Sequence, residues 1–289
     1  MNRRSVRTAW RAARLRAVAA AAAPFLLTIV PARANAQRGG RFPGGGGSFL
    51  NGALGCPNPP FRNLAYDGRF TFARLIYAGG PGNCYYRGEP SWAHGFGYTN
   101  PTAEQNLMRL TAQLSLLHGH LDGSEALEIE DPLLFKFPVA YLVEAGYLQL
   151  TDRQVKVLHD YLLKGGFIIV DDSRDDFRGS GGWANLAMQF GRILPGLEPI
   201  DVPITHPIFH SFFDVPSFNV IHQYYDRGPP IFRGIFQDND PRKRLLVMID
   251  FNTDISNYWE FSAMGFRPVS ESNQAFELGV NYLIYALTH

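Results

Sequence analysis

The sequence has no surplus of charge of either sign, only two cysteines and no specific catalytic signature. Its 27 basic and 26 acidic residues leave a net charge of +1, which removes the electrostatic basis for a nucleic-acid partner. No internal repeat is visible either. Apolar material is plentiful, because 46% of the 289 residues are hydrophobic. That is enough for one large core, and it predicts one folded domain.

The apolar run near the N-terminus is too short to predict a membrane span, and we expect no transmembrane helix in the mature chain. The N-terminal basic region is followed by Ala17 to Val30, an alanine-rich stretch of 14 residues, whereas a span needs about 20. Small residues at positions 34–36 then have the pattern of a cleavage site. We expect a signal peptide over residues 1–36, cleaved after Ala36, and a periplasmic or extracellular mature protein. Arg3 and Arg4 faintly resemble a twin-arginine motif, which leaves the export route open.

Residues 37–68 are rich in glycine and proline, which predicts a flexible leader before a folded domain at residues 69–289. Cys56 and Cys84 both lie in Gly/Pro-rich sequence, and neither closely follows the cleavage site, which excludes a lipoprotein anchor. Export would place them in an oxidising compartment, so we expect a disulfide between them. The alternative is a nucleophilic Cys84, but no strand-to-helix turn surrounds it, and an exported free thiol is open to oxidation.

Hydrophobic periodicity predicts alternating strands and helices over the folded domain. The strands are expected at residues 69–77, 127–130, 139–143, 167–170 and 244–250, and the helices at residues 100–121, 151–163, 183–193 and 276–287. Thr151 and Gln154 have the spacing of a capping box, and Gly165 is suited to end the same helix. Phe167 to Val170 is apolar without alternation, which is typical of a strand covered on both faces in a parallel sheet.

Five segments in this order resemble the bacterial DUF4159 family, a domain of unknown function. The matching segments are residues 72–77 (FARLIY), 131–138 (DPLLFKFP), 165–172 (GGFIIVDD), 206–210 (HPIFH) and 278–287 (LGVNYLIYAL). They span the chain from about residue 70 to its last residue. The resemblance implies a relative of the class I glutamine amidotransferase-like fold, which is a flavodoxin-like three-layer α/β/α sandwich with a mainly parallel sheet. It implies no established activity.

Amidotransferases of that fold carry a nucleophilic cysteine on a sharp turn after a buried strand, and a histidine and a glutamate complete the triad. At the corresponding turn this chain has Asp171, Asp172 and Ser173 instead. Glutamine hydrolysis by that mechanism is therefore not expected. Ser173 is a candidate nucleophile, but it lacks the flanking glycines of a Gly-x-Ser-x-Gly turn, and a loop-capping role is the alternative.

Carboxylates follow the central predicted strand, where open α/β sheets place their ligands. They are Asp171, Asp172, Asp175 and Asp176. His206 and His210 are the imidazoles to consider with them, because carboxylates and imidazoles can hold a divalent cation, or a histidine can accept a proton while an aspartate orients it. No motif in the sequence requires a cofactor. A divalent metal ion is the only kind of cofactor that these carboxylates and imidazoles suggest. The alternative for the aspartates is a solvated loop in which they cap local amides. The alternative for the histidines is a structural role.

Candidate binding residues also follow the predicted strand at 244–250. They are Asp250, Asn252, Asp254 and Trp259. These side chains could line the same edge, with loop capping as the rival interpretation. Trp92 and His94 precede the first predicted helix, where they could form an aromatic lip or pack in the core or a lid.

These patterns predict an exported domain that binds a ligand or partner without amidotransferase chemistry. The partner would be a small molecule, an envelope glycan or an envelope protein. One alternative is an envelope hydrolase that uses Asp171 or Asp172 with His206 or His210, with or without a metal. Another is a structural module of an envelope complex. The sequence leaves open whether the protein is an enzyme.

Overall fold

Apolar strand runs separated by amphipathic helices build a layered α/β domain, which lies within a compact unit at Ser48–His289. The structure is a computed structural model, and it describes residues 63–79, 90–94, 102–121, 124–174, 182–218, 228–265 and 267–289. The expected signal peptide lies outside these residues, as do most of the leader, Cys56 and Cys84 with their expected disulfide, Asp175 and Asp176. Within the described part of the chain, no helix combines the length and the apolar character that crossing a membrane requires.

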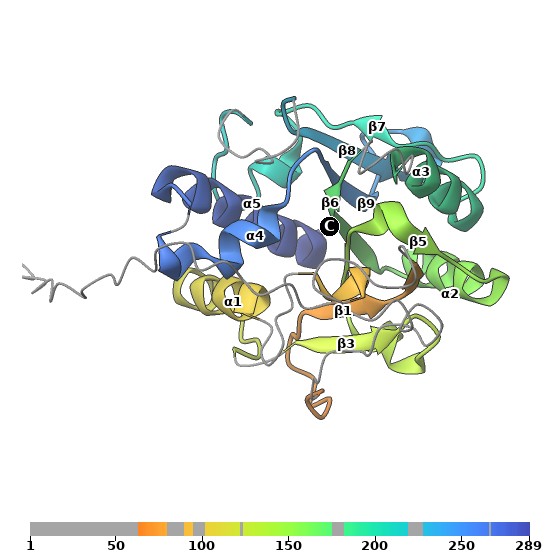
Figure 1. Ribbon diagram of the computed structural model, residues 1–289, viewed down its shortest axis with the longest axis horizontal. Helices are drawn as coiled ribbons and strands as arrows, with labels where there is room; N and C mark the ends of the chain where they lie inside the picture. Colours follow the sequence, from red (N-terminus) through yellow and green to blue (C-terminus); the bar gives the residue numbers. More distant parts are fainter. Residues whose placement is uncertain are drawn as a thin grey trace, which may run out of the picture. The chain divides into compact units, whose positions relative to one another are not determined.

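A seven-stranded sheet forms the middle layer among the described residues (Figure 1). In spatial order its strands are β3 (Glu125–Glu128), β1 (Ala73–Ile76), β4 (Val139–Val143), β6 (Phe167–Ser173), β9 (Leu245–Phe251), β8 (Ile231–Phe236) and β7 (Ile200–Asp201). The first five strands run parallel, and β8 and β7 extend the sheet in antiparallel register. A separate antiparallel pair joins β2 (Ala78–Gly79) to β5 (Leu148–Gln149).

Helices cover both faces of the sheet. The α-helices are α1 (Thr102–Leu114), α2 (Asp152–Leu163), α3 (Gly182–Ile193), α4 (Ile255–Glu260) and α5 (Val269–Thr288). The short 3-10 helices are η4 (Ser91–Ala93), η5 (Pro132–Lys136), η6 (Ala145–Tyr147), η7 (Pro207–Phe209), η8 (Gln237–Asn239) and η9 (Ser262–Met264). One core cluster joins the sheet to α1, α4 and α5, and a second joins its other face to α2 and α3. The layers are therefore helix, sheet and helix.

The sheet order confirms the flavodoxin-like prediction. If only the parallel strands are numbered along the chain, their spatial order is 2-1-3-4-5, which is the flavodoxin order. The buried strand β6 lies at its centre, and both of its neighbours, β4 and β9, run parallel to it. Complete burial of Phe167 to Val170 explains why this segment shows no alternation of apolar and polar residues.

The expected boundaries of α2 are confirmed by its local chemistry. Thr151 Oγ1 accepts a hydrogen bond from the Gln154 N–H at 3.2 Å, and Gln154 Oε1 accepts one from the Thr151 N–H at 3.0 Å. This is a capping box. At the other end Gly165 has φ +114°, a value that favours glycine over residues with a Cβ.

The expected extent of α1 is wrong, because α1 ends at Leu114 and does not reach residue 121. The Ser115 hydroxyl donates to the Thr111 carbonyl and accepts from the Leu117 N–H, which replaces helical hydrogen bonding there. Leu114 and Leu121 are 43% and 38% exposed, so the leucine face expected to run to residue 121 is not buried over its whole length.

The central strand β6 is longer than predicted, because it continues to Ser173. Asp171 pairs with Val143 of β4, and Ser173 pairs with Phe251 of β9 across a register shift. The first carboxylates after the apolar run are therefore part of the sheet and not of a solvated loop. Strands β7 and β8 and helix α4 were not predicted.

Candidate functional site

The carboxyl ends of β4, β6 and β9 meet at one edge of the sheet, and buried polar residues gather there. These residues are Glu144, Asp171, Asp172, Ser173, Arg174, Asp250, Asn252, Thr253 and Asp254, each at most 9% exposed. Buried ionisable groups are rare unless they are paired or functional. We call this region the carboxyl edge.

Three non-glycine residues at the carboxyl edge have left-handed backbone. Glu144 follows β4 with φ +53°, Asp172 lies in β6 with φ +51°, and Asn252 follows β9 with φ +58°. Such conformations cost about 1–3 kcal/mol each and concentrate at active sites and ligand clamps. The chain is therefore strained at the same edge on three neighbouring strands.

Arg174 joins the strands β4 and β6 through two ion pairs. Its Nη1 lies 2.8 Å from Asp172 Oδ1, and its Nη2 lies 3.0 Å from Glu144 Oε1. Burial raises the pKa of Glu144 well above its usual value, and the neighbouring Asp172 raises it further. Burial likewise raises the pKa of Asp172, with the charge of Asp254 as the next cause. The guanidinium partly offsets this accumulation of buried carboxylates.

His94 brings an imidazole to the carboxylates of β6 and of the β9–α4 connection. Its Nε2 lies 3.7 Å from Asp172 Oδ2 and 3.5 Å from Asp254 Oδ2. Burial by itself lowers the pKa of His94, but the approach of Asp254 to its ring and the charges of Asp254, Asp172 and Glu144 raise it to about 10. Burial raises the pKa of Asp254, but His94 reverses this and holds that pKa below its usual value.

The backbone of His94 is held by Arg74 on β1. Arg74 Nη1 donates to the carbonyls of Trp92, at 3.1 Å, and His94, at 2.5 Å. Arg74 Nε also donates to Glu104 Oε1 at 2.7 Å in the first turn of α1. Trp92 is 1% exposed, so it packs in the core and does not form an aromatic lip. His94 belongs to the carboxyl edge instead.

Asp171 serves the scaffold, although its position made it a candidate catalytic residue. It accepts hydrogen bonds from the Tyr141 hydroxyl, from the Ile255 N–H at 3.1 Å and from the Ser256 N–H at 2.9 Å. Burial and the charge of Asp254 raise its pKa to about 7, against the hydrogen bonds that favour its charged form. The carboxylate ties β6 to β4 and to the start of α4.

Of the four binding candidates at the end of β9 and after it, Asp250, Asn252 and Asp254 lie at the carboxyl edge, and Trp259 does not. Asp250 Oδ1 accepts from the Tyr282 hydroxyl at 2.9 Å, and Asn252 Nδ2 donates to the Pro229 carbonyl at 3.1 Å. Asp254 caps α4 through Oδ1, which accepts from the Asn257 N–H at 3.0 Å. Trp259 is 1% exposed, and its Nε1 donates to the Ala275 carbonyl. Trp259 therefore packs in the core and does not line the edge as predicted.

His206 and His210 do not join the carboxylates. The His206 ring packs on Phe236 and Tyr285, and its Nδ1 accepts from the Ile208 N–H at 3.2 Å. Phe236 pairs with Leu245 at the start of β9, which is the opposite end of that strand from Asp250. His210 contacts Asp214 and the Ile204 carbonyl near the surface. The expected pairing of these histidines with Asp171 or Asp172 is therefore wrong.

We expect His206 to make the protein less stable in acid. Burial, with His289 as a minor cause, lowers its pKa from 6.5 to about 4. Between these two pH values His206 is protonated in the unfolded chain but neutral in the folded chain. The free energy of unfolding is therefore not reduced by this residue above pH 6.5, and it falls as the pH drops toward 4. Urea unfolding across this range should show a loss of about 1–2 kcal/mol from this residue.

The matched control is His206→Asn, in which the amide oxygen can still accept from the Ile208 N–H. This variant should start less stable, because a smaller side chain leaves a gap beside Phe236 and Tyr285. Its stability should nevertheless change less steeply with pH than that of the wild type. Equal slopes in the two proteins would show that His206 does not carry the effect.

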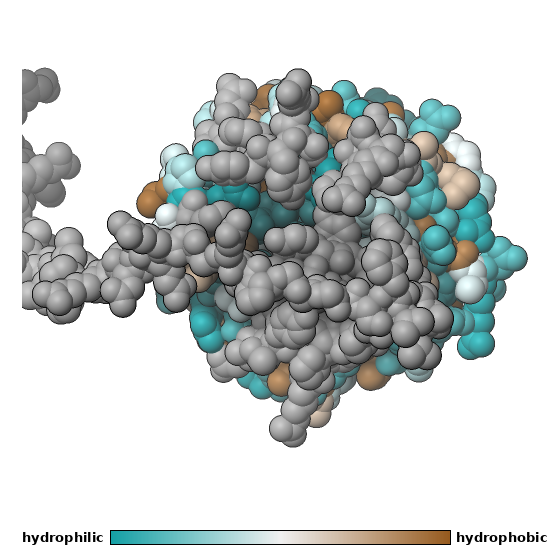
Figure 2. All heavy atoms as spheres, in the orientation of Figure 1, coloured by the Kyte–Doolittle hydropathy of each residue, from teal (hydrophilic) through white to brown (hydrophobic). Residues whose placement is uncertain are grey.

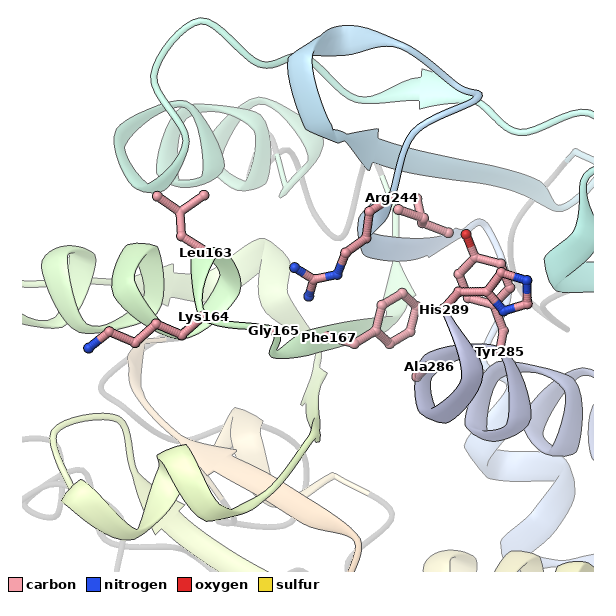
Figure 3. Close-up of a pocket in the computed structure, with 9 residues that line it drawn as sticks. Leu163, Lys164, Gly165, Phe167, Arg244, Tyr285, Ala286 and His289 are labelled. Carbon is pink, nitrogen blue, oxygen red and sulfur yellow. The ribbon is translucent and has the colours of Figure 1, made fainter.

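A cavity of about 350 Å³ lies at the opposite edge of the sheet (Figure 3). It lies beside the start of β6, the start of β9 and the end of α5, and Arg244 points toward the Gly165 turn there. The Arg244 guanidinium already donates to the carbonyls of Leu162 and Gly166. This arginine therefore closes the α2–β6 turn. The cluster of buried carboxylates lies at the other edge.

Sequence reasoning missed His94, Glu144 and Arg174 as members of one site. Glu144 could have been found, because it is the first polar residue after the apolar run of β4. His94 lies 78 residues before Asp172 in the sequence, and no spacing rule joins them. His94 directly follows η4, and only the folded chain brings it to the carboxyl edge.

Comparison with known proteins identifies the family and no activity. A search of curated proteins found no match. A family model described as "Domain of unknown function (DUF4159)" matches residues 71–287, which is most of the chain and runs from before β1 to the last turn of α5. The sheet, the strained carboxyl edge and the segments noted in the sequence all fall within this match. The chain belongs to the DUF4159 family.

Proposed function

We propose that this protein is an exported binding domain that holds a polar organic ligand at the carboxyl edge. Export rests on the signal peptide expected over residues 1–36. One observation carries the binding proposal: buried polar atoms without hydrogen-bond partners gather at this edge. A sugar or a peptide supplies hydroxyl or amide groups that could satisfy such atoms.

Four of these atoms come from the ends of β6 and β9 and the residues that follow. They are Ser173 Oγ, Asp250 Oδ2, Thr253 Oγ1 and Asp254 Oδ2, none of which has a hydrogen-bond partner among the described residues. A buried polar group left unsatisfied costs about 1–3 kcal/mol. A water or a ligand that pairs with them would recover that free energy, so the edge is suited to bind a molecule rich in donors and acceptors.

The position of the edge in the fold supports the same proposal. In doubly wound sheets ligands bind beyond the carboxyl ends of the strands, at the point where the strand order reverses. Here that point lies between β1 and β4. Glu144 directly follows β4, and η4, which His94 directly follows, contacts both strands. Hydrophilic described residues also line a hollow that lies, in the view of Figure 1, between α4 and β6 (Figure 2).

We further propose that the domain does not use amidotransferase chemistry. Its resemblance to the glutamine amidotransferase-like fold would place the nucleophile on the turn after the central strand. Asp172 occupies this position with φ +51°, so the strained backbone is present without a cysteine. Ser173 is 1% exposed, and it is not preceded by the glycine of a nucleophile turn.

A second candidate function is a hydrolase of envelope glycan or peptide. The observation that favours it is the approach of His94 to Asp172 and Asp254, since an imidazole between carboxylates can move a proton. This version replaces His206 and His210 of the sequence prediction by His94. Release of a cleaved product from an envelope polymer would support this candidate over simple binding.

The test of the proposed function is a thermal-shift screen of purified, metal-depleted mature protein with envelope sugars and peptides. A ligand present at about 100 times its Kd should stabilise the fold by about 2.7 kcal/mol. The same screen is run on Asp172→Asn, which removes one charge at the edge. The matched control is Asp214→Asn, which removes an exposed carboxylate paired with His210.

A ligand that raises the Tm of the wild type and of Asp214→Asn, but not that of Asp172→Asn, would locate the site at the carboxyl edge. Equal shifts in all three proteins would place binding elsewhere. If no sugar or peptide shifts the wild type, either metal-depleted or with a divalent cation added back, the proposed function is contradicted.

A further inference from the structure

We propose that His94, Asp172 and Asp254 form a binding site for one divalent transition-metal cation, with Zn²⁺ or Mn²⁺ as the class of ion. This inference deepens the proposed function and rests on it, because the cation would supply the positive charge to which a polar ligand binds at the carboxyl edge. An imidazole with two carboxylates is a mixed nitrogen and oxygen set, which suits these ions better than Ca²⁺ or Mg²⁺.

The spacing of the three side chains fits a shared ion. Nε2 of His94 lies 3.5 Å from Asp254 Oδ2 and 3.7 Å from Asp172 Oδ2, and one ligand atom from each residue lies within 4.8 Å of the others. Charged hydrogen bonds are shorter, at about 2.7–2.9 Å. Ligand atoms bonded at about 2.0–2.2 Å to one tetrahedral ion lie roughly 3.3–3.6 Å apart. The separations therefore approach those of a metal site more closely than those of direct hydrogen bonds.

The same ring nitrogen faces both carboxylates. A ring nitrogen carries at most one proton, so Nε2 cannot donate a full hydrogen bond to Asp172 and to Asp254 together. Its lone pair and the two carboxylate oxygens could instead bind one cation at the same time. The cation would then replace the imidazolium proton as the positive charge between them.

Asp254 gives an independent indication of a ligand. Its Oδ1 accepts from the Asn257 N–H and from the Ser256 hydroxyl, both at 3.0 Å. Its Oδ2 has no hydrogen-bond partner among the described residues, although the residue is only 4% exposed. This oxygen is the one that faces His94 Nε2. A buried charged oxygen is thus directed at the space that the three residues share.

Surrounding residues hold two of the three ligands in place. Arg174 binds Asp172 through Oδ1, whereas Oδ2 is the atom that faces His94. Arg74 binds the backbone carbonyl of His94. Outer contacts of this kind orient metal ligands, and their loss typically costs about 10–100-fold in metal affinity. Glu144 pairs with Arg174, which reduces the repulsion between that guanidinium and a cation.

The experiment uses untagged mature protein depleted of metal by a chelator. Calorimetric titration with Zn²⁺ and with Mn²⁺ should show one ion per chain. Bound Co²⁺ should give a visible absorption band whose intensity reports four or five ligands. Asp254→Asn and His94→Gln should each weaken binding at least about tenfold. Asp254→Asn keeps an oxygen for the α4 cap, so its fold should persist.

The matched control is His210→Gln, which removes the imidazole of a surface His–Asp pair outside the carboxyl edge. It should bind as the wild type does. No binding by the wild type at millimolar metal would overturn the site, and so would equal affinity in the wild type, His94→Gln and Asp254→Asn. The wild-type titration decides the matter even if a variant fails to fold.

The titration and the ligand screen fail independently. If a sugar or peptide stabilises the metal-depleted wild type while no metal binds, the proposed function holds and the metal site is wrong. If metal binds at these residues but no organic ligand stabilises the protein with or without it, the metal site holds and the proposed function is wrong.

Discussion

Replacing Arg74 with methionine is expected to lower the free energy of unfolding by about 3–5 kcal/mol. Arg74 and Glu104 are 0% and 1% exposed, and their atoms approach to 2.7 Å. Removing the guanidinium leaves the Glu104 carboxylate buried without its partner, and it also takes a donor from the carbonyls of Trp92 and His94. Urea unfolding should report the loss, with a fall in Tm of about 10 °C.

The control is the double variant Arg74→Met with Glu104→Gln, which removes both charges. Because an unpaired buried charge is the main penalty, the double variant should recover much of the lost stability. It still lacks the donor to the His94 carbonyl, so metal binding at His94 should remain weaker than in the wild type. A double variant as unstable as the single one would contradict the charge argument.

Replacing Asp171 with alanine is expected to cost about 3 kcal/mol of unfolding free energy. Three buried donors then lose their acceptor, namely the Tyr141 hydroxyl and the N–H groups of Ile255 and Ser256. Each unsatisfied donor costs about 1–3 kcal/mol, and relief of the repulsion between Asp171 and Asp254 offsets part of the sum. Chemical unfolding of the purified variant measures the effect.

Asp171→Asn separates the scaffold role from a role in binding. The amide keeps an oxygen acceptor, so this variant should lose only about 1–2 kcal/mol. It should bind metal and ligand as the wild type does, whereas Asp172→Asn should not, although the two residues are adjacent. Loss of binding in Asp171→Asn without loss of stability would show that Asp171 contacts the ligand directly.

Most of the central fold could be predicted from the sequence, because local chemistry sets it. The capping box at Thr151 and the glycine at Gly165 fix the limits of α2, and the apolar run after them has the pattern of a strand buried on both faces. The antiparallel strands β7 and β8 could not be predicted in this way. Their burial pattern is mixed, and they are defined by pairing with distant segments.

The candidate site was predicted in position but only partly in membership. Asp172 and Asp254 were expected at the carboxyl edge because polar residues follow buried strands, and the structure places both there. The histidine was chosen wrongly. His206 is a buried cap that packs on aromatic rings, and its sequence, with a proline directly after it, has nothing that separates this role from that of a ligand.

By itself, the sequence determined the alternation of helices and strands, the parallel core and the edge at which carboxylates accumulate. Those features follow from periodicity, capping residues and glycine, which act over a few residues. Only the tertiary structure decided which carboxylate supports the scaffold and which meets a histidine. Asp171 and Asp172 are neighbours in β6, but Asp171 bonds to α4 while Asp172 faces His94, and the left-handed backbone at Asp172 accompanies this division. Strand pairing and the packing of η4 against β1 and β4 set that geometry, and both depend on residues far apart in the chain.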